Sequence, residues 1–203
     1  MSGVFYDLLR HGEPVGGHRY RGQTDDPLSE RGWAQMWGAV PDDVPWRRVV
    51  TSPLARCRQF AVALGERFGL PVLEEPRFKE VRFGVWEGHT AHELEAADPG
   101  VLARFYADPV HNRPAGAEPL DAFAARVAEG WHAWTEPARR ESTLVVTHAG
   151  VVRAIMAEIL GIPLGRLYRV QVANAGLTRI KLSDDRPATP MFHGGCLAPG
   201  GEG

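Results

Sequence analysis

Cysteine is scarce in this sequence, long apolar runs are absent, and neither sign of charge dominates. The two cysteines, Cys57 and Cys196, lie far apart and match no metal or redox spacing, so both are predicted to be reduced thiols. No apolar stretch is long enough to span a membrane, and Met1 to Leu9 lacks the basic leader and apolar core of a signal peptide. We therefore expect a cytoplasmic protein without a membrane partner.

The balance of charge gives no support to a nucleic-acid partner. The formal net charge of the 203 residues is -2, whereas nucleic-acid binding generally requires a basic face. Any anion site must therefore be a local concentration of arginine. With 44% hydrophobic and 24% charged residues and no internal repeat, the composition is typical of one globular domain.

Short apolar runs alternate with helical patterns along the chain. Strands are predicted at Val4–Leu9, Val49–Thr51, Leu70–Glu74 and Thr143–Thr147. Helices are predicted to begin near Ser29, Pro53 and Pro119 and to occupy Val151–Leu160. This alternation predicts an α/β domain with three layers, α/β/α, and a largely parallel central sheet.

The other segments complete the predicted organisation. Residues 1–182 are predicted to form a single domain, in which 89–116 is a small cap insertion with two short helices broken at Pro99-Gly100. Leu167–Val172 and Leu177–Leu182 are predicted to be two late strands, paired at one edge of the sheet. Because Ser183–Gly203 is rich in Asp, Pro, Gly and Thr, we expect a weakly ordered tail there.

Three strand ends carry side chains suited to a phosphoryl group. They lead to Arg10 and His11, to the turn before Arg56, and to His148. Ligands of parallel sheets bind outside the carboxyl ends of the strands, so the topology predicts one shared site. Arginine presents a planar fork of donors, and a neutral histidine offers a nucleophilic nitrogen.

Phosphoryl transfer requires a positioned nucleophile and neutralisation of the phosphate charge. His11 is the predicted nucleophile, because the adjacent cation of Arg10 favours a neutral imidazole. Arg10, Arg56 and a protonated or donor-bearing His148 would neutralise the phosphate. The helix that begins near Pro53 is expected to turn its positive end toward the same region.

The leaving alcohol of a phosphate ester needs a proton. A carboxyl group buried beside an anionic phosphate holds its proton more tightly and can donate it near neutral pH, and Glu80 is the candidate. Glu80 would then accept a proton from the water that attacks the phosphohistidine. The scheme requires no cofactor and no metal, and the chain offers no compact cluster of ligand spacing, although His89 and His92 lie three residues apart.

Six motifs resemble, in order, those of the histidine phosphatase superfamily, which includes phosphoglycerate mutase. They are Leu9–Glu13, Gly22–Ser29, Thr51–Arg56, Glu80–Gly88, Pro114–Glu118 and Thr147–Arg153. The resemblance implies a phosphoglycerate mutase-like fold, with His11 phosphorylated, Glu80 as proton donor, and Arg10, Arg56 and His148 in the phosphate pocket. Pro14, Gly17 and Ala149 depart from the family pattern. Gly17 stands where many members have a phosphate-contacting Asn, so Gln23, or a backbone N–H near it, is a candidate substitute.

Within the superfamily the chain is most similar to α-ribazole phosphatases of cobalamin assembly. The grounds are its short length, the Glu80–Gly88 segment and the compact loop at Gly16-Gly17. This resemblance implies a metal-independent phosphomonoesterase acting on a small-molecule phosphate monoester, α-ribazole 5'-phosphate.

Two alternatives to this function stay open. One is a phosphoglycerate mutase, or a broad-specificity sugar or nucleotide phosphatase, with the same pocket. The other is a phosphate-dependent binding module without turnover, although binding alone would need neither the nucleophile His11 nor the acid Glu80. The oligomeric state is also open, and a homodimer is one option.

Overall fold

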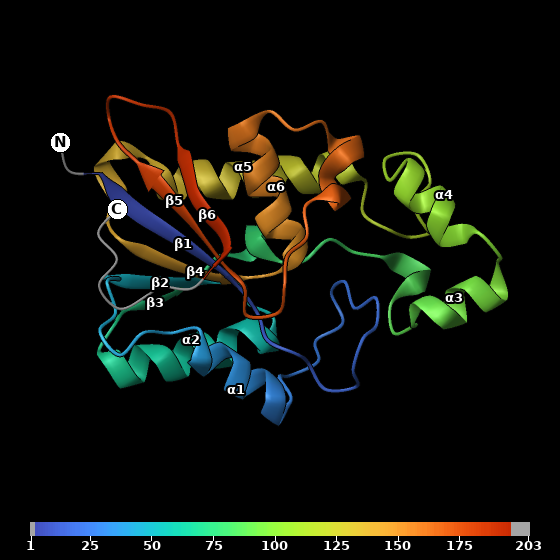
Figure 1. The fold of residues 1–203 in the computed structure, drawn as a ribbon, viewed down its shortest axis with the longest axis horizontal. Coiled ribbons are helices and arrows are strands. Elements are labelled where there is room, and N and C mark those ends of the chain that lie inside the picture. Colours follow the sequence, from blue (N-terminus) through green and yellow to red (C-terminus); the bar gives the residue numbers. More distant parts are fainter. Residues whose placement is uncertain (1–2, 196–203) are drawn as a thin grey trace.

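A computed structural model describes residues 3–195 and shows a six-stranded sheet with helices on both faces (Figure 1). The strands are β1 (Val4–Arg10), β2 (Arg48–Thr51), β3 (Val72–Glu74), β4 (Thr143–Thr147), β5 (Leu177–Leu182) and β6 (Thr189–Gly195). Their order is β3-β2-β4-β1-β5-β6. The first four are parallel, whereas β5 and β6 run antiparallel at one edge. The predicted three-layer fold with a largely parallel sheet is confirmed.

Two pairs of helices cover the sheet. The helices are α1 (Glu30–Gly38), α2 (Ala55–Phe68), α3 (Ala91–Ala97), α4 (Val101–Ala107), α5 (Leu120–Thr135) and α6 (Ala149–Leu160). Figure 1 shows α1 and α2 on one face and α5 and α6 on the other. Between residues 3 and 195, no helix has both the length and the apolar character needed to cross a membrane.

The side chains of β1 alternate between the two faces, as they must in a pleated strand. Tyr6 and Leu8 belong to the apolar core that includes the buried residues of α5 and α6. Leu9 belongs to the second core, with Met36 of α1 and Phe60 of α2. Because both of its faces are buried, β1 is fixed in register and delivers the residues after Leu9 to a defined place.

Several helix ends follow the signals in the sequence. Ser29 caps α1 through its Oγ, which accepts a hydrogen bond from the Gly32 N–H at 3.0 Å. Gly69 and Gly161 end α2 and α6 in the left-handed conformation, with φ of 66° and 65°. Cys57 is a buried free thiol on α2, as predicted, whereas Cys196 lies outside the described residues.

Two predictions for the C-terminal part are wrong. Leu164–Arg169 forms a 3₁₀ helix after Pro163 instead of contributing to a strand over 167–172, and Leu167 is its one buried residue. Residues 189–195, predicted to lie in a weakly ordered tail, form β6 and pair with β5. Pro190 and Phe192 are partly buried at alternate positions of β6, and an edge strand tolerates proline because one row of its N–H groups has no partner strand.

The two short helices α3 and α4 lie beyond the end of the sheet (Figure 1). Their predicted separation at Pro99-Gly100 is confirmed. They are anchored by the buried residues Leu94 and Phe105, and the ring of Phe105 packs edge to face on Trp86 with centroids 5.1 Å apart. That residues 89–116 form a cap insertion stays a prediction.

Candidate functional site

The register of the sheet brings two histidines together. Arg10 on β1 pairs with Thr147 on the adjacent parallel strand β4. The backbone N–H of His11 donates to the Thr147 carbonyl at 2.9 Å, so His11 and His148 leave the sheet side by side. Their rings pack edge to face with centroids 5.2 Å apart. Strand β2 ends at the same edge, and Arg56 follows in the first turn of α2.

A pocket opens at this edge of the sheet. It is lined by Arg10, His11, Arg56 and Glu80, and by loop residues between 13 and 22, Phe83 and Asn174. Four of its lining residues are arginines and two are glutamates. The sequence predicted that any anion site in this nearly neutral chain would be a local concentration of arginine, and the pocket is such a concentration.

His11 is held as a neutral imidazole with one free nitrogen. The residue is only 6% exposed, and burial, followed by the charges of Arg56 and Arg10, lowers its pKa well below the usual 6.5. Nδ1–H donates to the Gly12 carbonyl at 2.7 Å, which leaves Nε2 with its lone pair. The expected effect of Arg10 on the imidazole is thus present, but burial contributes more.

The guanidinium groups of Arg10 and Arg56 each retain an unused buried donor. Arg10 Nη1 donates to the Val172 carbonyl at 2.5 Å, and the two Nη atoms of Arg56 donate to the carbonyls of Thr24 and Gly22, both at 2.8 Å. The Nε atom of each arginine is buried and has no hydrogen-bond partner among residues 3–195. Burial lowers the pKa of Arg10 to about 10, which still leaves it charged at neutral pH. Unpartnered buried donors are rare, and these two are available to an anion.

Glu80 enters the pocket wall in a fixed orientation. Its side chain accepts the Val81 N–H on Oε1 at 2.9 Å and the Gly150 N–H on Oε2 at 3.2 Å. Gly150 is the second residue of α6, and a Cβ atom there would overlap Glu80 Oε1. Only glycine leaves room for the carboxyl group at this point of the helix.

Three groups that were predicted to contact the phosphate or the substrate make other contacts in the structure. His148 is fully buried behind His11, with Nε2 2.7 Å from Ser52 Oγ, and it is not among the residues that line the pocket. Gln23 does not line it either, because its Nε2 donates to the Glu80 carbonyl at 3.1 Å. The N-terminus of α2 lies at this edge, but Asp25 Oδ1 accepts its Ala55 N–H at 2.6 Å, and a contribution of this helix end to phosphate binding stays a prediction.

Arg21 and Asn174 are two of the lining residues that were not predicted as site residues from the sequence. Arg21 shapes the loop by donating from Nη2 to the carbonyls of Val15, at 2.7 Å, and Gly17, at 2.5 Å. Asn174 lines the pocket with a buried Oδ1 that has no partner in the described part of the chain. Its position follows from Ala175, which has a φ of 53° and donates its N–H to the His11 carbonyl at 3.3 Å. The basic, glycine-rich loop was a weak signal for Arg21, whereas nothing local pointed to Asn174.

A groove adjoins the pocket and shares Tyr20 and Phe83 with it. We call it the tyrosine–arginine groove, because it is also lined by Tyr106, Arg153, Tyr168 and Arg169. The hydroxyl of Tyr168 is buried without a partner between residues 3 and 195, and the Arg153 guanidinium lies 5.3 Å from the centroid of the Tyr168 ring. The groove therefore presents aromatic rings and cations to the part of a ligand that extends out of the pocket.

The lowered pKa values of the two histidines make folding stability sensitive to acid. Burial is the largest cause for both His11 and His148, and both pKa values fall well below 6.5. Below pH 6.5 the unfolded chain therefore binds more protons than the folded one, so stability falls as pH falls. Between pH 6.5 and 5.5 the free energy of unfolding should drop by about 1.4 kcal/mol per histidine per pH unit at most.

Urea unfolding at several pH values measures this slope. His11→Asn should remove roughly half of the part due to the two histidines, because one of the two groups no longer titrates. An unchanged slope in that variant would show that His11 is not held neutral by the fold.

Comparisons with known proteins agree with this geometry. The family described as Histidine phosphatase superfamily (branch 1) matches residues 7–192. A glucosyl-3-phosphoglycerate phosphatase of Mycobacterium tuberculosis is 35% identical over 172 residues, covering 77% of this chain and 75% of the relative. A probable phosphoglycerate mutase of Erwinia tasmaniensis is 26% identical over 177 residues, 85% of this chain and 82% of the relative. The solved structure of the α-ribazole phosphatase from Shigella flexneri superposes with a TM-score of 0.82 at 25% identity, covering 98% of this chain and 100% of that one.

Proposed function

This chain belongs to the histidine phosphatase superfamily and is a phosphoric monoester hydrolase, and we propose that it acts without a metal through a phosphohistidine on His11. One observation carries the proposal. The free Nε2 of a neutral imidazole lies in the same pocket as two arginines whose buried Nε donors have no partner among the described residues. Such a pocket supplies both the nucleophile and the charge neutralisation of phosphoryl transfer.

In the first half-reaction the substrate phosphate binds to Arg10 and Arg56. His11 Nε2 attacks phosphorus, the N–P bond forms, and the bond from phosphorus to the ester oxygen breaks. The carboxyl group of Glu80 gives its proton to that oxygen, so the alcohol leaves neutral. Because the amides of Val81 and Gly150 hold the carboxyl group, its direction is set before the substrate arrives.

In the second half-reaction a water molecule attacks the phosphohistidine. Glu80, now a carboxylate, accepts a proton from the water, the N–P bond breaks, and inorganic phosphate leaves with His11 neutral again. One carboxyl group thus serves both steps, and the enzyme returns to its starting state.

Asn174 is a substitute for the side chain that Gly17 lacks. It lines the pocket, and its Oδ1 is buried without a partner within residues 3–195. Its amide group can donate to a phosphate oxygen through Nδ2. Gln23 is less suited to this task, because its Nε2 is already bound to the Glu80 carbonyl.

The proposed substrate is α-ribazole 5'-phosphate. The likeness to the Shigella flexneri structure supports it, and so do the rings of Tyr20, Tyr106 and Tyr168 in the groove, which suit a planar aromatic base. A second candidate is glucosyl-3-phosphoglycerate, the substrate named for the Mycobacterium tuberculosis relative. Arg153 and Arg169 favour it, because a glycerate carboxylate would find cations in the groove.

Phosphate release from a panel of esters tests both the reaction and the substrate. The panel contains the two candidate substrates, 3-phosphoglycerate, and glycerol 3-phosphate as its matched partner without a carboxylate. We expect phosphate release that excess chelator does not reduce, with the highest kcat/KM on α-ribazole 5'-phosphate. A clear preference for 3-phosphoglycerate over glycerol 3-phosphate would favour the second candidate. Loss of activity with chelator, or phosphoryl migration on phosphoglycerate without phosphate release, would contradict the proposed reaction.

A further inference from the structure

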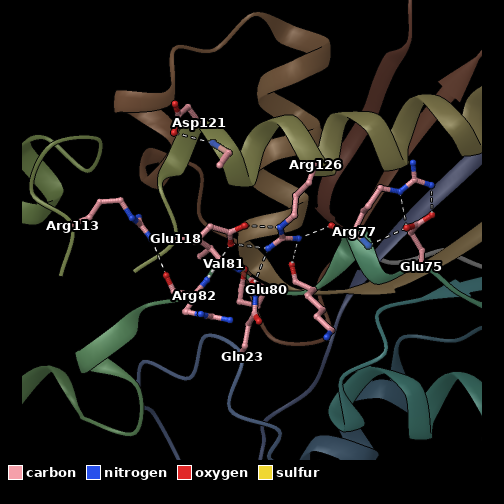
Figure 2. A network of polar contacts seen from close by, with 12 residues as sticks. Gln23, Glu75, Arg77, Glu80, Val81, Arg82, Arg113, Glu118, Asp121 and Arg126 are labelled. Atoms are coloured by element: carbon pink, nitrogen blue, oxygen red, sulfur yellow. Dashed lines mark hydrogen bonds and ion pairs between the residues drawn. The ribbon is translucent and has the colours of Figure 1, made fainter. Parts of the chain in front are cut away.

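Arg126, on α5, binds the chain segment that carries Glu80 (Figure 2). Its Nη1 donates to the carbonyls of Arg77, at 2.6 Å, and Lys79, at 2.8 Å. Its Nη2 donates to the carbonyl of Glu80 itself at 3.1 Å. A single guanidinium group therefore ties down three carbonyls within four residues.

Glu118 fixes the guanidinium group in turn. Arg126 Nε donates to Glu118 Oε1 at 2.7 Å and Nη2 to Oε2 at 2.9 Å, which is the two-pronged geometry of a strong arginine–carboxylate pair. The ring of Phe123 lies 4.8 Å from the guanidinium carbon. The side chains of Arg126 and Glu118 are only 21% and 19% exposed, so water competes little for these bonds.

The segment depends on Arg126 because it has no regular structure of its own. It consists of a 3₁₀ turn over Pro76–Phe78 and an irregular stretch from Lys79 to Phe83. No strand ladder holds its carbonyls, and the Glu80 carbonyl is bound by the side chains of Arg126 and Gln23. The position of the Glu80 backbone decides whether its carboxyl group meets the amides of Val81 and Gly150.

We propose that Arg126 is a positioning residue for proton transfer by Glu80. The inference rests on the proposed function, in which Glu80 protonates the leaving oxygen. Arg126 does not line the pocket and contacts Glu80 only through its carbonyl. Its loss would displace the carboxyl group while leaving the phosphate contacts of Arg10 and Arg56 in place.

A proton donor speeds the departure of a poor leaving group but not of a good one. If Arg126 positions the proton donor, its loss should slow only the ester with the poor leaving group, whereas the loss of a residue that merely supports the fold should slow both esters. Arg126→Gln should lower kcat/KM, which reports the phosphorylation of His11, about tenfold for an alkyl phosphate, and less than about threefold for 2,4-dinitrophenyl phosphate, whose leaving group needs no proton. Arg126→Lys keeps the charge and part of the bonding, so it should recover part of the lost rate on the alkyl phosphate.

Arg140→Gln is the matched control. Arg140 has a side chain 23% exposed, pairs with Asp184 at 2.7 Å and donates to the Thr135 carbonyl at 2.9 Å, so it is a similarly covered, ion-paired arginine without contact to residues 77–83. It should leave the rates on both esters unchanged. Equal losses on both esters in Arg126→Gln would overturn the proposal.

A double variant tests whether Arg126 acts through Glu80. If it does, Glu80→Gln with Arg126→Gln should be about as slow on the alkyl phosphate as Glu80→Gln alone, because the group being positioned is already gone. If the loss in the double variant is instead the product of the losses in the two single variants, the positioning role is overturned. A Glu80→Gln variant whose kcat/KM falls equally on both esters would instead reject the acid in the proposed function.

Arg126→Gln removes a donor from three carbonyls, of which that of Glu80 keeps Gln23, and the variant can fail to fold, so a second variant is needed. Glu118→Gln keeps the guanidinium but removes its carboxylate partner. This milder change should give the same selective loss on the alkyl phosphate, about threefold, with a thermal unfolding midpoint close to that of the parent protein. An equal loss on both esters in a folded Glu118→Gln protein would count against the proposal.

Discussion

His11→Ala is expected to abolish phosphate release from every ester, good or poor in its leaving group. The variant loses the nucleophile, and neither Arg10 nor Glu80 can take its place, because one is a cation and the other is turned toward two backbone amides. Removing the nucleophile of an enzyme commonly lowers kcat by a factor on the order of 10⁴ or more. Steady-state phosphate release measures this loss.

The covalent intermediate gives a second measurement for the same variant. Substrate labelled in the phosphate should transfer label to the parent protein, and the label should be lost in acid but stay in alkali, as expected for a phosphorus–nitrogen bond. His18→Ala is the matched control, because His18 also lines the pocket but is exposed. It should keep both turnover and label, whereas label persisting in His11→Ala would place the intermediate on another residue.

Much of the site could be predicted from the sequence, because the residues that follow parallel strands lie at the same edge of the sheet. The apolar runs at the start of the chain and at Thr143–Thr147 predict buried strands, and the structure adds that these strands are neighbours, so the parallel register of β1 and β4 sets His11 beside His148. Arg56 follows from the end of β2 for the same reason. Arg10, His11, Arg56 and His148 could be joined into one site because the carboxyl ends of parallel strands lie at one edge. Glu80 follows no such strand end, and its place in the site came from the chemistry of a proton donor and from the family motif.

The remaining features depend on loop contacts that no local pattern encodes. Asp25 binds the N-terminus of α2 only because the loop before α1 folds back on it, a contact that the sequence around Pro53 does not indicate. Asn174 reaches the pocket through a left-handed Ala175, a conformation that residues other than glycine rarely adopt. Strand β6 has few apolar residues, so its sequence did not predict a strand. It is held by backbone hydrogen bonds to β5, which depend on the fold.

The electrostatics of the site also follow from the fold more than from adjacent residues. Burial outranks the neighbouring charges in lowering the pKa values of both His11 and His148. A strand end in a sheet with helices on both faces is shielded from water, and burial there keeps an imidazole neutral and nucleophilic. The neighbouring cations act in the same direction. The same burial leaves the Nε donors of Arg10 and Arg56 without partners among residues 3–195, ready for a phosphate.

Glu80→Gln should slow the enzyme by a factor that depends on the leaving group. For an alkyl phosphate the loss should be about 10² to 10⁴ in kcat, the usual contribution of a positioned general acid. For 2,4-dinitrophenyl phosphate, whose leaving group is stable as an anion, phosphorylation of His11 should be nearly as fast as in the parent protein. Glutamine keeps the shape of the side chain, but its single oxygen can accept only one of the amides of Val81 and Gly150, which bind different oxygens of the glutamate. The rate on the dinitrophenyl ester therefore shows how much of the loss comes from this change in bonding rather than from the missing proton.

The two half-reactions can be separated in this variant, because Glu80 is also expected to accept a proton from the attacking water. With 2,4-dinitrophenyl phosphate, Glu80→Gln should release dinitrophenol in a rapid burst and then accumulate phosphohistidine, since only the second step still needs the carboxylate. Glu13→Gln is the control, because Glu13 lines the same pocket but pairs with Arg31 at 3.4 Å, and it should change both esters alike. Equal losses on both esters in Glu80→Gln, without a burst, would mean that another group moves the proton.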